Sequence, residues 1–279
     1  MVKTGTLFIV STPIGNLDDI THRAIKVLNE VDLIAAEDTR HSQKLLQHWG
    51  VKTRMTAVHD HNEKQISNRL IEQLKEGLNV ALISDAGTPL ISDPGYNLVN
   101  RCREQEVTVV PIPGVCAAIA ALSASGLPTD QFLFYGFLPV KQVAKHSVLE
   151  RLNSETATTV FYESPRRIAD TVKAIIEVLG EDRKLSIAKE ITKTFETFYS
   201  ASAVEVLAWL LEDANHQRGE FVLMVAGAPK NHNELPAESL QLLKILLQDL
   251  PLKKAAALTA QHFGVKKNAL YQYGLTLNE

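Results

Sequence analysis

The amino-acid sequence predicts an α/β fold with a mostly parallel sheet, followed by a small helical module. Short apolar runs alternate with longer amphipathic stretches through the first half of the 279 residues, as is typical of strands and helices in this class. Gly- and Pro-bearing loops follow three of the predicted strands. A polar linker, AGAPKNHNELPAE, then separates the body of the chain from a lysine-bearing tail.

The first half is expected to contain five strands and four helices. Each strand candidate is a short apolar run, and each helix candidate places apolar residues at helical spacing. The predicted strands are residues 6–10, 31–36, 55–58, 79–84 and 107–111, and the predicted helices are near residues 21–30, 41–49, 63–75 and 97–105.

The second half opens with a helix of small residues, 115–125, and then changes character. The segment IAKEITKTFETFYS looks like two adjacent strands joined by a tight turn, so we expect a mixed sheet. The predicted strands are residues 132–135, 158–162, 185–189, 195–199 and 220–226, and the predicted helices are near 142–152, 165–178 and 202–211.

The pattern of the tail predicts three short helices, near residues 239–247, 252–262 and 266–275. It carries five lysines against three acidic residues, an excess of two on a chain whose net charge is −3. Two interpretations stay open: a helical cap with solvated lysines, or a helix-turn-helix-like module that contacts RNA phosphates. The lysines are Lys244, Lys253, Lys254, Lys266 and Lys267.

Composition sets limits on the function. With 45% apolar and 22% charged residues the chain is ordinary for a globular protein, and its net charge gives no support to a nucleic-acid partner. Cys102 and Cys116 are the only cysteines and form no C-x-x-C pair, so neither a disulfide framework nor a zinc site is indicated. The sequence has no recognisable signal peptide or membrane-spanning segment, and we expect a cytoplasmic protein.

Three loops are candidates for ligand binding, because ligands of open α/β sheets collect at the carboxyl ends of strands. The first is residues 11–16, where Gly15 permits a turn that other residues resist. The second, residues 84–95, holds Asp85, which can accept hydrogen bonds from a ligand, and Asp93, which we expect to cap the next helix. The third is residues 111–118, where Cys116 is expected to form part of a wall of small residues.

Charged residues also follow two other predicted strands, in the segments 36–41 and 189–193. Ion-paired surface is the commonest fate of such residues. The run from His59 to Glu63 contains H-x-H, which is a weak metal signal, and we expect no metal site. The G-x-G-x-x-G dinucleotide fingerprint does not occur in the chain.

The combined motifs resemble the tetrapyrrole-methylase superfamily, and more closely its 16S ribosomal RNA (cytidine-2′-O)-methyltransferase family. The resemblance covers residues 6–228 and the tail segment VKKNALYQYGL. In the superfamily the first loop reads G-x-G-x-G-D, whereas here two of the glycines and the acid are replaced, a departure that the RNA family shares. The segments that carry the resemblance are TPIGNLDDIT, AAEDTRHS, SDAGTPLISDPG and PIPGVCAAIAALSASGLP.

The resemblance implies a two-domain class III methyltransferase fold, with domains at residues 1–113 and 114–228 and a helical module at 236–279. It further implies a homodimer that binds S-adenosylmethionine between the domains and methylates a cytidine ribose in the decoding centre of small-subunit ribosomal RNA or the 30S subunit. The cofactor contacts that carry over are Ile14, Asp85, Thr88, Cys116 and Ala117, together with Tyr162 and Ala226 at the ends of later strands.

A ribose hydroxyl is a poor nucleophile near neutral pH and needs proton removal or a nearby cation. We expect Lys189 or Glu190 to assist it and Arg40 to hold a phosphate, with Glu37 and Asp38 on the same RNA-facing side. Two other functions stay open. One is a corrinoid or precorrin C-methyltransferase, and the other is a non-catalytic RNA-binding assembly factor on a methylase scaffold.

Overall fold

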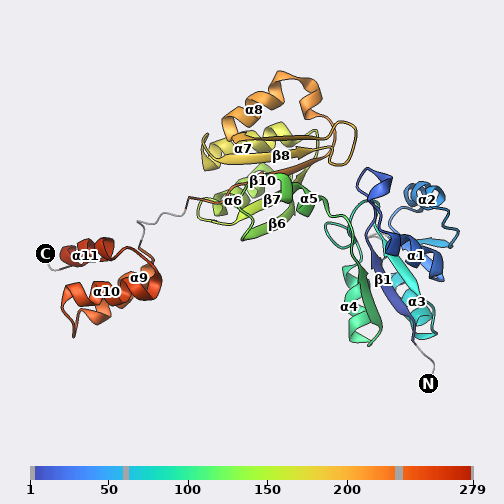
Figure 1. Ribbon diagram of the computed structural model, residues 1–279, viewed down its shortest axis with the longest axis horizontal. Helices are drawn as coiled ribbons and strands as arrows, with labels where there is room; N and C mark the ends of the chain where they lie inside the picture. The colour runs from blue at the N-terminus through green and yellow to red at the C-terminus, as the bar shows by residue number, and fades with distance from the viewer. Residues whose placement is uncertain (1–3, 59–62, 230–234, 278–279) are drawn as a thin grey trace. The chain divides into compact units, whose positions relative to one another are not determined.

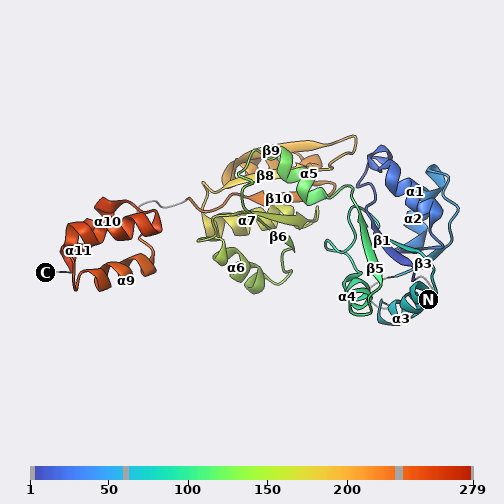
Figure 2. The ribbon, with the colours of Figure 1, turned by 60° about the horizontal axis from the view of Figure 1, so that its bottom comes forward.

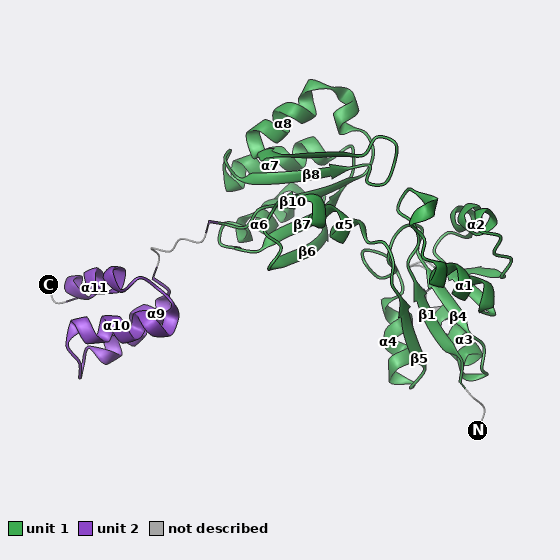
Figure 3. Cartoon of the chain, in the orientation of Figure 1, with its two compact units in different colours: residues 1–228 green, residues 229–279 purple. Residues whose placement is uncertain are grey.

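The computed structural model describes residues 4–58, 63–229 and 235–277. The chain forms two compact units, Met1–Ala228 and Pro229–Glu279 (Figure 3). The first unit contains two five-stranded sheets (Figure 1), and the second is helical. Division of the first unit into domains at residues 113 and 114 stays a prediction.

The first sheet is wholly parallel, as predicted, and has the strand order β3-β2-β4-β1-β5. Buried apolar residues line both of its faces, as parallel sheets require. Helices α1 and α2 cover one face and α3 and α4 cover the other. The elements are β1 Thr6–Val10, α1 His22–Glu30, β2 Leu33–Ala36, α2 Thr39–His48, β3 Met55–Ala57, α3 Glu63–Lys75, β4 Val80–Ile83, α4 Tyr96–Glu104 and β5 Thr108–Ile112.

The second sheet is mixed, also as predicted, with the order β6-β7-β10-β8-β9. Only β6 and β7 run parallel, and β10 is antiparallel to both of its neighbours. Helices α6, α7 and α8 pack on one face and α5 on the other; Figure 2 labels α5, α6 and α7 beside this sheet. The elements are α5 Ala117–Ala124, β6 Phe132–Phe137, α6 Gln142–Arg151, β7 Thr158–Glu163, α7 Ile168–Leu179, β8 Lys184–Lys189, β9 Thr197–Ser202, α8 Ala203–Glu212 and β10 Phe221–Val225.

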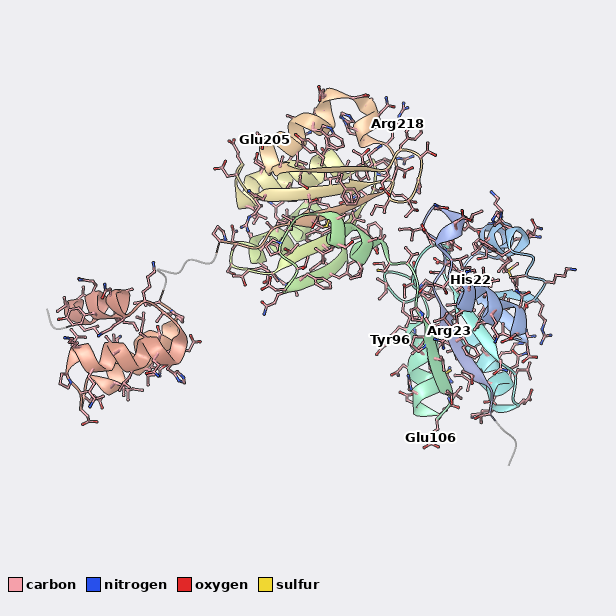
Figure 4. The ribbon with its side chains drawn as sticks, in the orientation of Figure 1. His22, Arg23, Tyr96, Glu106, Glu205 and Arg218 are labelled. Carbon is pink, nitrogen blue, oxygen red and sulfur yellow. The ribbon has the colours of Figure 1, made fainter. Side chains whose placement is uncertain are left out.

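The connection between β8 and β9 is longer than the tight turn that the sequence predicts. Residues 190–196 form two consecutive turns, in which the amide of Lys193 donates to the carbonyl of Glu190 and the amide of Glu196 to that of Lys193. Strand β9 therefore begins at Thr197 rather than at residue 195 and runs on to Ser202. A capping box between Ser202 and Glu205, which Figure 4 labels, then starts α8.

The second unit has the three helices that the tail predicts: α9 Ala237–Leu246, α10 Leu252–Phe263 and α11 Lys267–Thr276. They enclose a small core of Leu243, Ala255, Ala256 and Leu270. Gly264 ends α10 in the left-handed conformation that commonly terminates helices. In the described part of the chain, no helix is long and apolar enough to cross a membrane.

Candidate functional site

The first unit contains a cavity of about 470 Å³, which is within the usual range for small-molecule and cofactor sites. Its wall combines the loops that follow β1, β4 and β5 with the ends of strands in the second sheet. The lining residues include small ones, such as Gly87 and Ala117, and apolar ones, such as Ile14 and Val222. The cavity can therefore hold a ligand with a large apolar surface and a few polar groups.

The three loops of the first sheet are bonded to one another through Thr88. Its hydroxyl lies 2.9 Å from the hydroxyl of Ser11 and donates to the carbonyl of Val115 at 2.9 Å. A pair of backbone hydrogen bonds between Thr12 and Gly87 joins the first two loops again. These bonds fix the cavity wall before any ligand binds.

Two glycines fit this wall for different reasons. Gly87 has a φ of +83°, a conformation that strains other residues. Gly15, by contrast, has no positive φ, so the prediction that it permits a special turn is wrong. Glycine is required at this position by the close approach of a neighbour, because a Cβ there would lie 2.6 Å from Cγ of Lys193.

Five of the seven residues predicted to contact a cofactor line the cavity together: Ile14, Thr88, Cys116, Ala117 and Tyr162. Cys116 belongs to the wall of small residues at the start of α5, as the sequence indicates. The hydroxyl of Tyr162 accepts a hydrogen bond from the amide of Ala118 at 3.3 Å. Burial, together with nearby Cys116, raises the pKa of this phenol well above its usual value, so Tyr162 stays neutral.

The other two, Asp85 and Ala226, are absent from the lining. Asp85 accepts a hydrogen bond from the amide of Asp38 at 3.1 Å, so its carboxylate connects the ends of β4 and β2. Ala226 follows β10, whose first residues, Phe221 and Val222, line the cavity. Because β10 is antiparallel to β7, its carboxyl end lies at the opposite edge of the sheet, on the order of 14 Å away at about 3.4 Å per residue.

None of the five residues predicted to face RNA lines the cavity. Asp38 caps α2 by accepting from the amide of Arg40 at 2.8 Å, and its carboxylate pairs with the exposed Arg40 guanidinium at 3.2 Å. Those hydrogen bonds lower the pKa of Asp38. Glu37 accepts from the amide of Asp85 at 3.4 Å. Lys189, only 7% exposed, ends β8 opposite Phe221.

Glu190 holds the connection between β8 and β9 in place. It adopts a positive φ of 52°, and its carboxylate pairs with Lys193 at 3.0 Å and accepts from the amide of Glu220 at 2.9 Å. Burial would raise the pKa of Glu190, but these hydrogen bonds and the ammonium of Lys193 hold it below its usual value. Ile191, the next residue, lines the cavity, and Thr192 accepts from the amide of Asn16 at 3.0 Å.

Asp93 is a cavity residue that the sequence misassigns. The Asp-Pro-Gly pattern predicts a helix cap, but α4 begins at Tyr96 (Figure 4), and its N-cap is Gly95. Asp93 lines the cavity instead. Burial, with the negative charges of Glu37 and Asp85 nearby, raises the pKa of Asp93 to about 6, against the opposing effect of a hydrogen bond with Ser84.

A second cavity residue that sequence reasoning missed is Glu163, which ends β7 and is buried. Its carboxylate accepts from the hydroxyl of Thr171 at 2.8 Å and pairs with Arg167 at 3.3 Å. The buried ammonium of Lys145 donates to the same threonine hydroxyl at 3.4 Å. The sequence signal for Glu163 is its position between a predicted apolar strand and a Ser-Pro pair.

The His59–His61 run lies outside the described residues. Within residues 4–58, 63–229 and 235–277, no group of three or more His, Cys, Asp and Glu side chains is placed to hold a metal ion.

Comparison with known proteins identifies the family of the chain. Residues 6–207 match the tetrapyrrole (corrin/porphyrin) methylases. The chain belongs to this family. Residues 233–278 match the RsmI C-terminal HTH domain, in agreement with the three helices of the second unit.

Among curated relatives of this tetrapyrrole methylase are two proteins named ribosomal RNA small subunit methyltransferase I. The protein from Escherichia coli O157:H7 is 55% identical over 271 residues, which cover 97% of this chain and 95% of the relative. The protein from Haemophilus influenzae is 54% identical over 274 residues, with coverage of 98% and 97%.

Solved structures share the fold of this tetrapyrrole methylase at much lower identity. Uroporphyrin-III-C-methyltransferase from Thermus thermophilus has a TM-score of 0.57 at 21% identity and covers 80% of this chain and 94% of its own. The methyltransferase CobJ has a TM-score of 0.60 at 16% identity, with coverage of 81% and 95%. These similarities show the fold alone.

Replacing Asp93 by Asn in this tetrapyrrole methylase should increase stability in a pH-dependent way. An acid whose pKa is higher in the folded than in the unfolded state favours folding below about pH 4, and that contribution is lost as the pH rises through about 6. Asn has no carboxyl group to ionise, so the variant does not lose stability in this way as the pH rises. The gain in unfolding free energy should therefore grow between pH 4 and pH 7 to about 1–2 kcal/mol, after a discount for partial exposure.

Urea unfolding at several pH values measures this effect. Asp182→Asn, at an exposed position, is the control and should change stability by less than about 0.5 kcal/mol. A gain for Asp93→Asn that is constant with pH would contradict the raised pKa.

Proposed function

We propose that this protein is an S-adenosylmethionine-dependent methyltransferase that methylates the ribose 2′-hydroxyl of a decoding-centre cytidine in small-subunit ribosomal RNA. The observation that carries the proposal is the 55% identity to a ribosomal RNA small subunit methyltransferase I over 97% of the chain. That similarity spans both the cavity and the helical unit. The similarity to the uroporphyrin-III-C-methyltransferase structure, at 21% identity, shows the fold alone.

The residues of the cavity fit S-adenosylmethionine. Cys116, the N-cap of α5, makes no side-chain capping bond. The Ala118 amide donates to Tyr162, and the other amides at the helix start can meet a ligand carboxylate. The apolar side chains of Ile14 and Val222 suit a purine ring. When bound, the cofactor supplies a methyl group activated by a sulfonium. The chain's own contribution is to exclude water and to orient the two reactants.

We assign the RNA-facing side to the ends of β2 and β8, with Glu37, Asp38, Arg40, Lys189 and Glu190. Arg40 is exposed and can contact a phosphate through the guanidinium edge that Asp38 leaves free. Lys189 provides a positive charge next to the cavity for the oxygen that becomes negative during attack. Glu190 supports this role indirectly, because its bonds to Lys193 and Glu220 fix the connection that follows β8.

The helical unit is assigned to RNA binding. All five of its lysines are exposed, and four of them lie at or next to the starts of α10 and α11. Lysines at helix starts suit contact with phosphates. The similarity to a helix-turn-helix domain supports this assignment.

We further propose that the protein works as a homodimer in the cytoplasm, where ribosomal subunits are its substrate. Strand β6 is an edge strand, because β7 is its only neighbour in the sheet. It exposes several large apolar side chains, and exposed apolar edges are covered in most proteins. They are Phe132, Leu133 and Tyr135.

The proposed function predicts that the protein transfers a tritiated methyl group from S-adenosylmethionine to 30S subunits of cells lacking the enzyme. The label should map to one cytidine and resist alkali, since a 2′-O-methyl group blocks cleavage at that ribose. Subunits from cells that have the enzyme are the control and should take up little label. Label in a macrocycle extract but not in ribosomal RNA would reject the proposal, and failure to bind labelled cofactor would favour a non-catalytic assembly factor.

The assignment of Lys189 predicts that Lys189→Ala lowers turnover about tenfold to a hundredfold, because a charge that stabilises the developing oxyanion is lost. Lys184→Ala is the matched control, since Lys184 is an exposed lysine at the other end of the same strand. Turnover on 30S subunits and cofactor affinity are measured together. If Lys189→Ala and Glu190→Ala both keep near-wild-type turnover with cofactor binding intact, neither residue assists the hydroxyl.

The proposed dimer interface at β6 predicts that Leu133→Asp converts the protein to a monomer, because the interface would then bury an unpaired carboxylate. Light scattering should give twice the 30.8 kDa chain mass for the wild type and the single mass for the variant. Leu211→Asp changes another exposed leucine, on α8, and should leave the dimer intact. A monomeric wild type would contradict the proposed dimer. A dimeric Leu133→Asp variant would show that the interface lies elsewhere.

A further inference from the structure

The cavity wall contains three acidic residues, Asp93, Glu163 and Glu220. Two of them are already engaged with cations. Glu163 pairs with Arg167 and accepts from Thr171 and from the amide of Ser164, and Glu220 pairs with Lys193 at 2.9 Å. Among the side chains that the structure describes, Asp93 has no ion-pair partner.

Asp93 also differs from the other two in its surroundings. The groups that act on it are carboxylates or neutral hydroxyls: Glu37 from the end of β2, Asp85 and Ser84 from the end of β4, and Tyr162 from β7. Glu37 and Asp85 are themselves joined to backbone amides across the two loops. A carboxylate in such a site is destabilised relative to its acid form, and it gains by taking up a proton.

The loop that carries Asp93 is held in a strained conformation. Leu90 and Ser92 both adopt positive φ values, 72° and 68°, although neither is glycine. Non-glycine residues in this region cluster at functional sites, where the surrounding structure maintains them. Asp93 directly follows Ser92 in this loop and lines the cavity, and the N-cap of α4 is Gly95.

We propose that Asp93 is the general base that takes the proton of the ribose 2′-hydroxyl. This inference rests on the proposed function. The 2′-oxygen forms a bond to the methyl carbon while the carbon–sulfur bond breaks and its electron pair stays on sulfur. The hydroxyl proton passes to Oδ of Asp93, so a sulfonium and a carboxylate become a neutral thioether and a neutral acid.

The energetics of the site suit this step. Separated charges are unfavourable in a cavity that is partly shielded from water. The reaction removes one positive charge, on the sulfonium, and one negative charge, on the carboxylate. A base is most effective when its pKa lies just below the working pH, because it is then ionised and still basic. With a pKa of about 6, Asp93 is mostly ionised at pH 7.5 and more basic than an ordinary aspartate.

Single-turnover methylation of 30S subunits by Asp93→Asn and Asp93→Glu variants tests the proposal. Asp93→Asn should lower the rate at saturating cofactor by about 100-fold or more, the usual contribution of a general base, while the Kd for S-adenosylmethionine changes less than about threefold. Asp93→Glu should recover part of the rate. The wild-type rate should rise with pH through about 6, and this rise should be lost in Asp93→Asn. Asp182→Asn, far from the lining in sequence and exposed, should behave like the wild type.

The outcomes separate the two proposals. A wild-type protein that labels no ribose in ribosomal RNA would reject the proposed function regardless of Asp93. An active wild type, with an Asp93→Asn variant that keeps its rate and its pH profile, would overturn the role of Asp93. So would a variant whose only defect is a large increase in the Kd for the cofactor, since Asp93 would then bind the cofactor and not the proton.

Discussion

The hydrogen bonds of Thr88 are the interaction on which the site depends. They join the loops that contain Ser11 and Val115, more than a hundred residues apart, to the loop after β4. Parallel strands bring these loops to one edge of the sheet, but nothing in a parallel sheet fixes the loops themselves. The hydroxyl of Thr88 and the backbone pair between Thr12 and Gly87 supply that constraint.

The fold was largely predictable because its signals are local. Alternating apolar runs and helical periodicity predict both sheets and nearly all of the helices of the first unit, and the mixed character of the second sheet follows from one segment. The placement of Ala226 was not predictable, because strand direction depends on pairing between distant segments. The end of a strand is near the ligand only if that strand runs toward it, and β10 runs away.

Charged residues were easy to find in the sequence and hard to assign. Asp38, Asp85 and Glu190 all follow apolar runs, yet in the structure each accepts hydrogen bonds from backbone amides. Asp93 has the sequence signature of a helix cap and lines the cavity instead. What decides these roles is which amides and cations lie within about 3 Å of each carboxylate, and only the tertiary structure contains that information.

The distribution of charge around the cavity constrains how a polyanion can approach. Glu37 and Asp85 lie close enough to Asp93 to raise its pKa, and a phosphate placed beside these three carboxylates would be repelled. Under the proposed function, the phosphates of an RNA would be met by exposed cations, such as the Arg40 guanidinium. A ribose, which is neutral, can enter where its phosphates cannot. The carboxylates that would repel a phosphate do not repel the ribose, which is the group of the RNA that the proposed reaction needs.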